Sequence, residues 1–525
     1  MIKEYKLNDN GTQLYTQLLA ARQSSENYEL LKKSEPIINI AGVGRLISAA
    51  YEQLRNATEY AQEHLLMQKA MRRFYVRNLS FQNKMTVKKT IAEELIIELT
   101  QSGYIDNNTQ PVKIISDLKT IIDKHYNNFW RLKAAKVDVH TAQKWILDLL
   151  SVEAENIIVK DNKQTIFVHF AYRHYKETLS KDLFISTKSD ESIYESSLYI
   201  AAHRSLLKSD VAMVRYDMEK MYNISDKKID DYIYFHKNID KIFYLDITNK
   251  ITRYINKYGA PLRILNSMIQ NDDISEYLNS RENFNDMFGD RVERDYKRAK
   301  SKLNSGLIKS IIFLLITKSL IGLAIEIPYD LFATGTIVIM PLVINLLTPV
   351  VYMTLLRLGM KMPNNINTKA ILSYTDEMLY SDGSQVNLRP VVKDKSYPTG
   401  FKIAYAVMFL TVFGLVFELL AMLGFNIVQG VIFFIFFATS SFLGFRLSRI
   451  VQELELVVEK SGILTTVRDY LFLPFTMLGK WLSEKYQKVN IVSLILDTII
   501  ELPLKTLLRL VRQWTGFIDQ KKDEI

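Results

Sequence analysis

The chain contains no cysteine and few residues that interrupt helices. With 0 Cys among 525 residues, disulfides, thiolate zinc sites, iron–sulfur clusters and a cysteine nucleophile are excluded, and a reducing compartment is favoured. Gly (19) and Pro (11) are scarce, as expected for long helices. Sustained alternation of apolar and polar residues, the mark of strands, is missing. The sequence therefore predicts an all-α protein.

Signatures of known enzymes are missing as well. The sequence has no GxxxxGK[ST], GxSxG, HExxH or EF-hand pattern. His169 and His174 are close, but five residues place them about 140° apart around a helix. His174 and Glu177 share a face, yet an HxxE pair is frequent by chance. We assign no catalytic, cofactor or metal residue, and a hydrolase using these three side chains is the third of our hypotheses.

Four long apolar runs determine where the protein resides. They cover residues 306–327, 331–358, 401–424 and 425–445, in a chain whose mean hydropathy is only -0.01. A helix crosses the hydrocarbon layer with about 20 apolar residues, so each run is long enough to span it. The runs predict an integral membrane protein with about four spans, arranged as two hairpins.

The charged flanks predict the orientation of these spans. Basic residues precede the first span at residues 291–302, whereas the segment after it, residues 326–330, carries only acids. Further basic residues follow span two, precede span three and follow span four: Arg357, Lys361, Lys393, Lys395, Lys402, Arg446 and Arg449. Because positive residues mark the cytoplasmic side, both termini are expected on the cytoplasmic side of the cell membrane.

The net charge of +10 fits the same arrangement. Positive-inside bias and attraction to anionic lipid headgroups account for it. Basic and aromatic residues also gather between positions 72 and 89, but without the pattern of a nucleic-acid-binding module. We therefore expect the lipid bilayer, and not nucleic acid, as the partner of these charges.

The chain divides into five predicted segments. Residues 1–300 form a helical cytoplasmic domain without a secretory signal, in which residues 47–77 read as one long amphipathic helix. Residues 301–358 and 401–446 are transmembrane hairpins, and the cytoplasmic loop 359–400 is expected to fold against the first domain. Residues 447–525 are expected to form cytoplasmic or interfacial amphipathic helices, of which the stretch 491–514 lies on the membrane or spans it.

Two ionisable residues lie deep inside predicted spans. Lys318 is in the first span and Glu418 is in the third, each about 24 Å from a basic residue at the cytoplasmic end. A charge at such depth is costly unless it pairs or snorkels, so we predict that the two side chains pair. The pair either fixes the packing of the hairpins or relays protons or ions.

The second span contains Pro341, Asn345 and Pro349, spaced by four residues. Prolines free backbone carbonyls and kink helices, and broken helices line substrate sites in transporters. These residues are therefore candidates for a kink or for the lining of a pore. Packing of a kinked helix against its neighbours is the simpler interpretation.

Two stretches resemble uncharacterised membrane proteins of candidate-phyla, ultra-small bacteria. They are residues 51–73 (YEQLRNATEYAQEHLLMQKAMRR) and 198–216 (LYIAAHRSLLKSDVAMVRY). In those proteins a helical cytoplasmic region precedes a few spans. The resemblance implies a bacterial cytoplasmic membrane, and it brings no assigned chemistry.

Two functions remain open from the sequence. A membrane-anchored binding or scaffold protein is favoured by the size of the cytoplasmic domain, which would bind a protein partner. The alternative is a small channel or transporter subunit, expected to form a homo-oligomer, that uses Lys318, Glu418, Asn345 and the two prolines of the kinked second span. Nothing in the sequence argues for an enzyme, although it does not exclude one.

Overall fold

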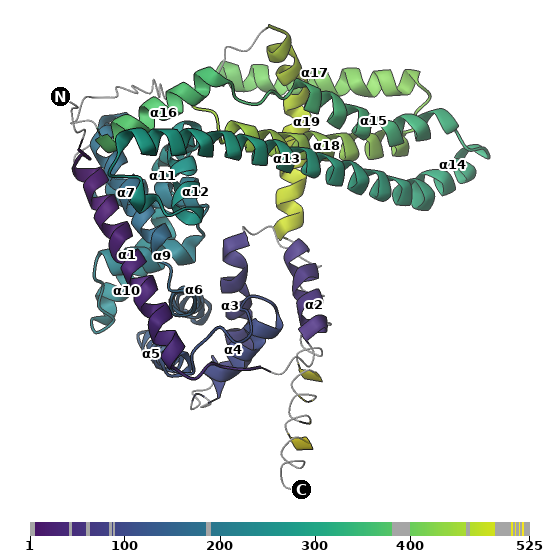
Figure 1. The fold of residues 1–525 in the computed structure, drawn as a ribbon. Coiled ribbons are helices and arrows are strands. Elements are labelled where there is room, and N and C mark those ends of the chain that lie inside the picture. Colours follow the sequence, from purple (N-terminus) through teal and green to yellow (C-terminus); the bar gives the residue numbers. More distant parts are fainter. Residues whose placement is uncertain are drawn as a thin grey trace, which may run out of the picture.

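The computed structural model confirms an all-α fold. It describes residues 6–40, 45–58, 63–82, 90–184, 191–380, 399–457, 463–488 and the single positions 87, 506, 507, 510, 514, 517 and 518. Within these ranges the only extended pairing is an isolated antiparallel bridge between Ile37 and Pro111. Figure 1 shows a helical domain from which a group of long helices extends to one side.

The helical domain is built from short and medium helices. They are α1 (Asp9–Ser34), α2 (Arg45–Thr58), α3 (Leu66–Asn78), α4 (Ile91–Gln101), α5 (Ile114–Ala134), α6 (Val139–Val159), α7 (Lys163–Thr178), α8 (Glu191–Ala202), α9 (Val211–Met221), α10 (Ile229–Ile242), α11 (Asp246–Tyr258) and α12 (Ala260–Asn271). Apolar residues at helical spacing explain their packing. In α11, for example, the buried positions 248, 251, 252 and 255 recur every three or four residues and form one face.

These helices bury two hydrophobic cores. One core lies among α3, α4, α5 and α6 around Trp145 and Phe129. The other joins α1 and α7 to α12, and it also takes in Phe284 from the beginning of α13 and Ile371 from α16. Two elements that lie beyond residue 280 thus complete the core of the domain.

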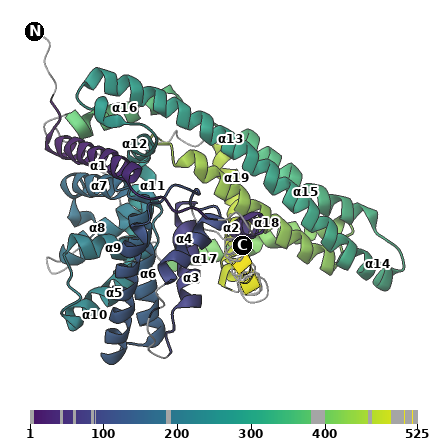
Figure 2. The same cartoon turned by 60° about the horizontal axis from the view of Figure 1, so that its bottom comes forward.

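The long helices carry the candidate membrane spans. They are α13 (Arg281–Ile321), continued by the π turn η6 (Gly322–Glu326) and α14 (Ile327–Thr334), then α15 (Ile339–Gly359), α17 (Thr399–Met422) and α18 (Ile427–Gln452). By length and composition 4 helices of the described chain can cross a membrane, with Arg281–Ala333 counted as one. Figure 2 shows α15 alongside the distal part of α13. The protein is therefore a membrane protein.

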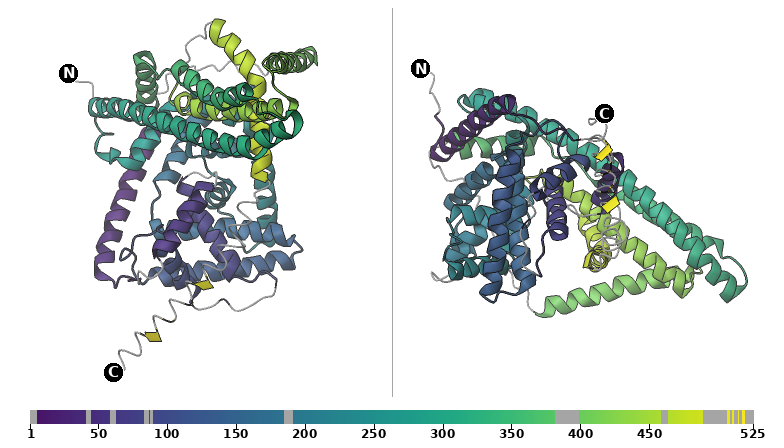
Figure 3. Two further views of the ribbon diagram at one scale, coloured as in Figure 1. Left: turned by 90° about the vertical axis from the view of Figure 1, so that its right-hand side faces the viewer. Right: turned by 90° about the horizontal axis from the view of Figure 1, so that it is seen from below.

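The remaining helices connect the two parts. α16 (Asn365–Tyr380) lies in the loop between the hairpins and packs into the second core of the domain. α19 (Ile463–Lys488) crosses α18, where a Cβ added at Gly479 would stand 2.1 Å from the carbonyl oxygen of Ala438. Glycine thus lets the two backbones touch. α17 stands apart from α13 and α15 (Figure 3).

Three local predictions change. The segment 47–77 is not one helix, because the 3-10 turn η1 (Glu63–Leu65) precedes α3. The acidic segment 326–330 is not a turn, since the helix runs on to Thr334 and the chain reverses at Gly335, whose φ is 71°. Most of the stretch 491–514, predicted to lie on or span the membrane, falls outside the described residues.

Candidate functional site

The predicted pair of Lys318 and Glu418 does not form. The ammonium group of Lys318 lies 2.7 Å from Oε1 of Glu326, and these side chains are only 3% and 0% exposed. Glu418 lies on the exposed side of α17. The partner of Lys318 therefore comes from its own helix.

The π turn explains why residues eight apart can meet. In a regular α-helix, positions 318 and 326 would be displaced by about 80° around the axis. The turn η6 is wider than an α-helical turn and takes up an extra residue, which reduces this displacement. Pro328 follows directly and has no N–H to donate to a carbonyl in the preceding turn. The irregular helix thus turns Glu326 toward Lys318.

α15 brings an amide to the same carboxylate. Nδ2 of Asn345 donates to Oε2 of Glu326 at 3.1 Å and to the backbone carbonyl of Gln429 at 3.3 Å. Pro341, Asn345 and Pro349 are all buried, on the side of α15 that packs against α13 and α18. Pro341 occupies the first helical turn, where no N–H is needed, so only Pro349 interrupts the hydrogen-bond ladder.

A second carboxylate lies nearer the distal end of the hairpins. Asp330 accepts from Nε2 of Gln429 at 2.9 and 3.1 Å and from Nδ2 of Asn426 at 2.8 Å. Asn426 also caps α18, accepting from the N–H of Gln429 at 2.9 Å. Gln429 therefore links the two halves of the cluster, because its carbonyl faces Asn345 and its side chain faces Asp330.

We call these six side chains the intramembrane network: Lys318, Glu326, Asp330, Asn345, Asn426 and Gln429. Its apolar surroundings include the ring of Phe436, 4.7 Å from the ammonium nitrogen of Lys318. Sequence reasoning found Lys318 and Asn345 and missed the others. The available signal was the four-residue spacing of Glu326 and Asp330, which puts both acids on one helix face.

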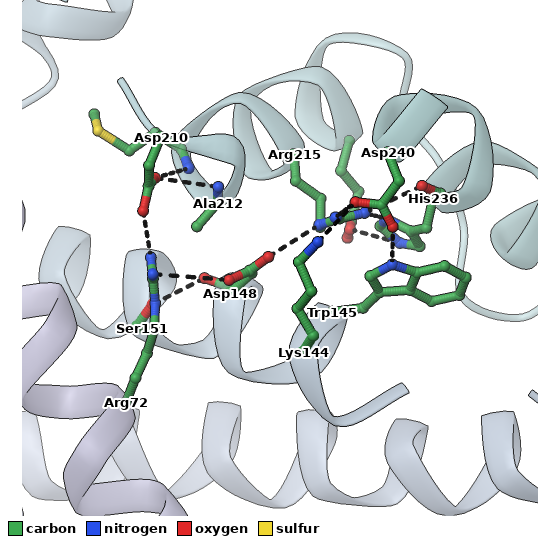
Figure 4. Close-up of polar contacts among 12 residues, drawn as sticks. Arg72, Lys144, Trp145, Asp148, Ser151, Asp210, Ala212, Arg215, His236 and Asp240 are labelled. Carbon is green, nitrogen blue, oxygen red and sulfur yellow. Dashed lines mark hydrogen bonds and ion pairs between the residues drawn. The ribbon is translucent and has the colours of Figure 1, made fainter. Parts of the chain in front are cut away.

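A second polar cluster lies within the helical domain (Figure 4). Arg215 of α9 is 0% exposed, and its Nη2 lies 2.7 Å from Oδ1 of Asp240 on α10. Its Nε lies 3.5 Å from Oδ2 of Asp148 on α6. Arg72 of α3 approaches Oδ1 of the same Asp148 at 3.8 Å. Alternating charges thus tie four helices together, and we call this row the Arg215 brace.

The surroundings of the brace shift the pKa values of its acids. Burial raises the pKa of Asp148 above its ordinary value, although Arg72 and Arg215 favour the charged form. Burial also acts on Asp240, but there Arg215 and the indole N–H of Trp145, 2.6 Å from Oδ2, outweigh it and lower the pKa. The brace is enclosed by α6, α9 and α10, so its geometry indicates a structural role.

The histidines considered for metal binding have separate partners. Nε2 of His174 lies 2.7 Å from the hydroxyl of Tyr374, and Nε2 of His169 lies 3.2 Å from the hydroxyl of Tyr199. Glu177 is exposed. Among the residues that the structure describes, no group of three His, Cys, Asp or Glu side chains could hold a metal ion.

Comparison of this chain with protein-family models, with curated proteins and with solved structures finds no match.

Proposed function

We propose that the chain is a multi-pass protein of the bacterial cytoplasmic membrane that acts as a membrane-anchored binding or scaffold protein. The observation that supports this function is the course of α13. Phe284 and Phe288 at its beginning lie in the core of the helical domain, and Leu314 lies in the core formed with α15 and α18. One uninterrupted helix from Arg281 to Ile321 joins the two cores. A binding domain held in this way keeps a fixed position relative to the membrane.

Further contacts support a rigid connection. Asn367 of α16 is buried and donates to the carbonyl of Leu454, just beyond α18, at 2.8 Å. Its Oδ1 accepts from the N–H groups of Leu456 and Val457 at 2.7 and 3.0 Å. Lys208 of the domain pairs with Glu453 at 2.6 Å. The domain is thus attached near the ends of both hairpins.

The positions of basic residues support a cytoplasmic domain. Arg357 and Asn304 meet at the domain end of the spans, with 2.8 Å between Nε and Oδ1, and Arg446 and Arg449 lie near the same end of α18. The distal turn near Gly335 carries no basic residue. Under the positive-inside rule, this distribution supports a cytoplasmic location of the domain and of both termini.

Single cysteines test this topology, because the natural chain has 0 Cys. Ile337→Cys, at an exposed position of the distal turn, should react with an impermeant maleimide in intact cells. Lys369→Cys on α16, also exposed, should react only after permeabilisation. The reverse pattern would overturn the proposed orientation.

Photo-crosslinking tests the binding function. Tyr234 and Tyr244 are large exposed side chains on and just after α10, 71% and 66% exposed. A photo-reactive residue at either position should capture the same protein in living cells, whereas one at Phe332 near the distal turn should capture lipid or nothing. Absence of any protein adduct from the domain, together with ion flux in liposomes, would refute the scaffold in favour of transport.

A channel or transporter subunit is the second candidate, and the intramembrane network favours it. Ionisable residues inside a membrane are costly, and they mark ion pathways and proton relays in pumps and transporters. α17 exposes most of its apolar surface, with 17% of its most apolar window buried, so a second copy of the chain could complete the assembly. In proteoliposomes this candidate predicts flux that Glu326→Gln abolishes and Glu418→Gln leaves unchanged.

A further inference from the structure

One buried oxygen of the intramembrane network has no hydrogen-bond donor. Both acceptors near the amide of Asn345 face its Nδ2 end, and Oδ1 has no partner among the residues that the structure describes. Asn345 is 1% exposed. Buried acceptors are nearly always satisfied, and leaving one without a donor costs free energy. This oxygen is therefore suited to bind a cation or a proton.

The backbone of Asn345 adds a second acceptor. In a regular helix its carbonyl would accept from the N–H of residue 349, but Pro349 has none. Freed carbonyls in interrupted membrane helices coordinate sodium ions or protons in transporters. Asn345 thus offers a side-chain oxygen without a donor and a backbone carbonyl that lacks its regular helical donor.

The charge of the network indicates the sign of the ligand. When Lys318, Glu326 and Asp330 are ionised, the six side chains carry one net negative charge. A net charge inside a hydrocarbon layer is costly, and one bound positive charge removes it. A divalent ion would overcompensate, and it commonly needs several carboxylates or retained water.

We propose that Asn345 and Glu326 bind one monovalent cation, either a sodium ion or a proton. Rotation of the amide about its last side-chain bond exchanges Nδ2 for Oδ1. Oδ1, Oε2 of Glu326 and the carbonyl of Gln429 then face the same point and share a sodium ion. If the ligand is a proton, it resides on Oε2 and is donated to Oδ1. Lys318 remains on Oε1 in both cases.

The network also offers a route to this site. Asp330 lies next to the distal turn, where it accepts from the N–H of Val338 at 3.4 Å and where residues 335–337 are exposed. Gln429 bridges Asp330 to Asn345. A cation from the distal side thus passes from one carboxylate to the next without entering the lipid. The inference goes beyond an anchored scaffold, and it requires no net transport.

The test measures binding by the full chain in nanodiscs. The midpoint of thermal unfolding is followed while NaCl replaces choline chloride at constant ionic strength, and the series is repeated at several pH values. A ligand that binds only the folded protein raises this midpoint with its concentration. Asp330 and Lys318 are the charged groups next to Glu326, whereas α15 and α18 contribute the uncharged Asn345 and Gln429. We expect the wild-type midpoint to rise saturably with sodium, with acid, or with both in competition.

Variants assign the effect to the site. Glu326→Gln and Asn345→Leu should weaken the apparent affinity at least tenfold, whereas Glu418→Gln, at an exposed carboxylate of the neighbouring span, should leave it unchanged. Lys318→Met should strengthen it by about ten- to a thousandfold, because the competing ammonium is removed. Loss of folding cannot mimic this gain.

The outcomes distinguish a sodium site, a proton site and the absence of a cation site. A response to sodium at fixed pH identifies a sodium site, and a response to acid alone identifies a proton site. An unfolding midpoint that depends on neither, or a loss of response in Glu418→Gln equal to that in Glu326→Gln, overturns the proposal. Because no partner protein and no flux enter the measurement, its failure leaves the scaffold function standing.

Discussion

The ion pair of Lys318 and Glu326 makes a strong prediction about membrane-protein stability. The two groups are 2.7 Å apart and almost wholly buried, so each neutralises a charge that the lipid and the apolar core cannot. Lys318→Met leaves the carboxylate without its cation, and Glu326→Leu leaves the ammonium without its anion. Removing one partner of a buried pair costs about 3–5 kcal/mol, and we expect each single variant to lose that much.

The double variant should recover most of this loss. Replacing a buried ion pair by apolar side chains of similar volume is often neutral or stabilising. Asn345 would still lose one of its two acceptors, because Glu326 Oε2 is gone, and a hydrogen bond contributes about 1 kcal/mol. The double variant is thus expected about 1 kcal/mol below the wild type, which implies a coupling of several kcal/mol between the two sites.

Reversible unfolding by sodium dodecyl sulfate in mixed micelles is a suitable assay, followed by far-UV circular dichroism. The matched control is a second cycle in which Glu418→Leu replaces Glu326→Leu. Glu418 is exposed on α17 and not in contact with Lys318, so this cycle should be additive within about 0.5 kcal/mol. A larger coupling to Glu418 than to Glu326 would refute the geometry described above.

Three further predictions concern other parts of the chain. Arg215→Met should lower the free energy of unfolding of the domain by about 3 kcal/mol in urea titrations, because the buried Asp148 and the partly buried Asp240 would both lose a cationic partner, and an unchanged midpoint would contradict the brace. Burial raises the pKa of Glu219 to about 7, so its folded form holds a proton that the unfolded chain releases, and domain stability should fall between about pH 4.5 and pH 7. Because burial also raises the pKa values of Asp217 and Glu155 to about 7, Glu219→Gln should reduce that slope without removing it, and an unchanged slope would contradict the contribution of Glu219. Asn367→Ala should lose about 3 kcal/mol and expose residues 453–457 to a protease that cleaves after glutamate, at Glu453 and Glu455, whereas the exposed neighbour Lys369→Ala should do neither.

The sequence predicted the fold class and the presence of membrane-spanning helices because features that extend over many residues dominate them. An apolar run such as residues 339–359 can only be a buried or lipid-embedded helix, whatever its neighbours are. The contact of α16 with the domain also agrees with the expectation that so long a loop packs against something. Such inferences depend on composition over many residues and tolerate local irregularity.

The site depended on one irregular turn, and there the prediction was wrong. Pairing Lys318 with Glu418 assumed regular helices whose depth is set by their length. The π turn Gly322–Glu326 changes which face Glu326 occupies, and Pro328 is its only clear signal in the sequence. The acids at 326 and 330 were assigned to a turn because the apolar run seemed to end there. Because one extra residue in the π turn changes the helical phase, the sequence pattern did not indicate Glu326 as the partner of Lys318.

The intramembrane network is a better candidate for a functional site than the Arg215 brace. The brace lies in the helical domain, outside the candidate membrane spans, and its charges alternate from helix to helix. The network lies among helices that are long and apolar enough to cross a membrane, where an apolar core would pack with less cost. It nevertheless combines a π turn, an interior proline at 349 and a buried amide oxygen without a donor. Departures from ideal packing that gather at one point indicate a functional constraint. Glu326, where the ion pair and the amide meet, is accordingly the residue whose substitution separates an anchor from an ion-binding protein.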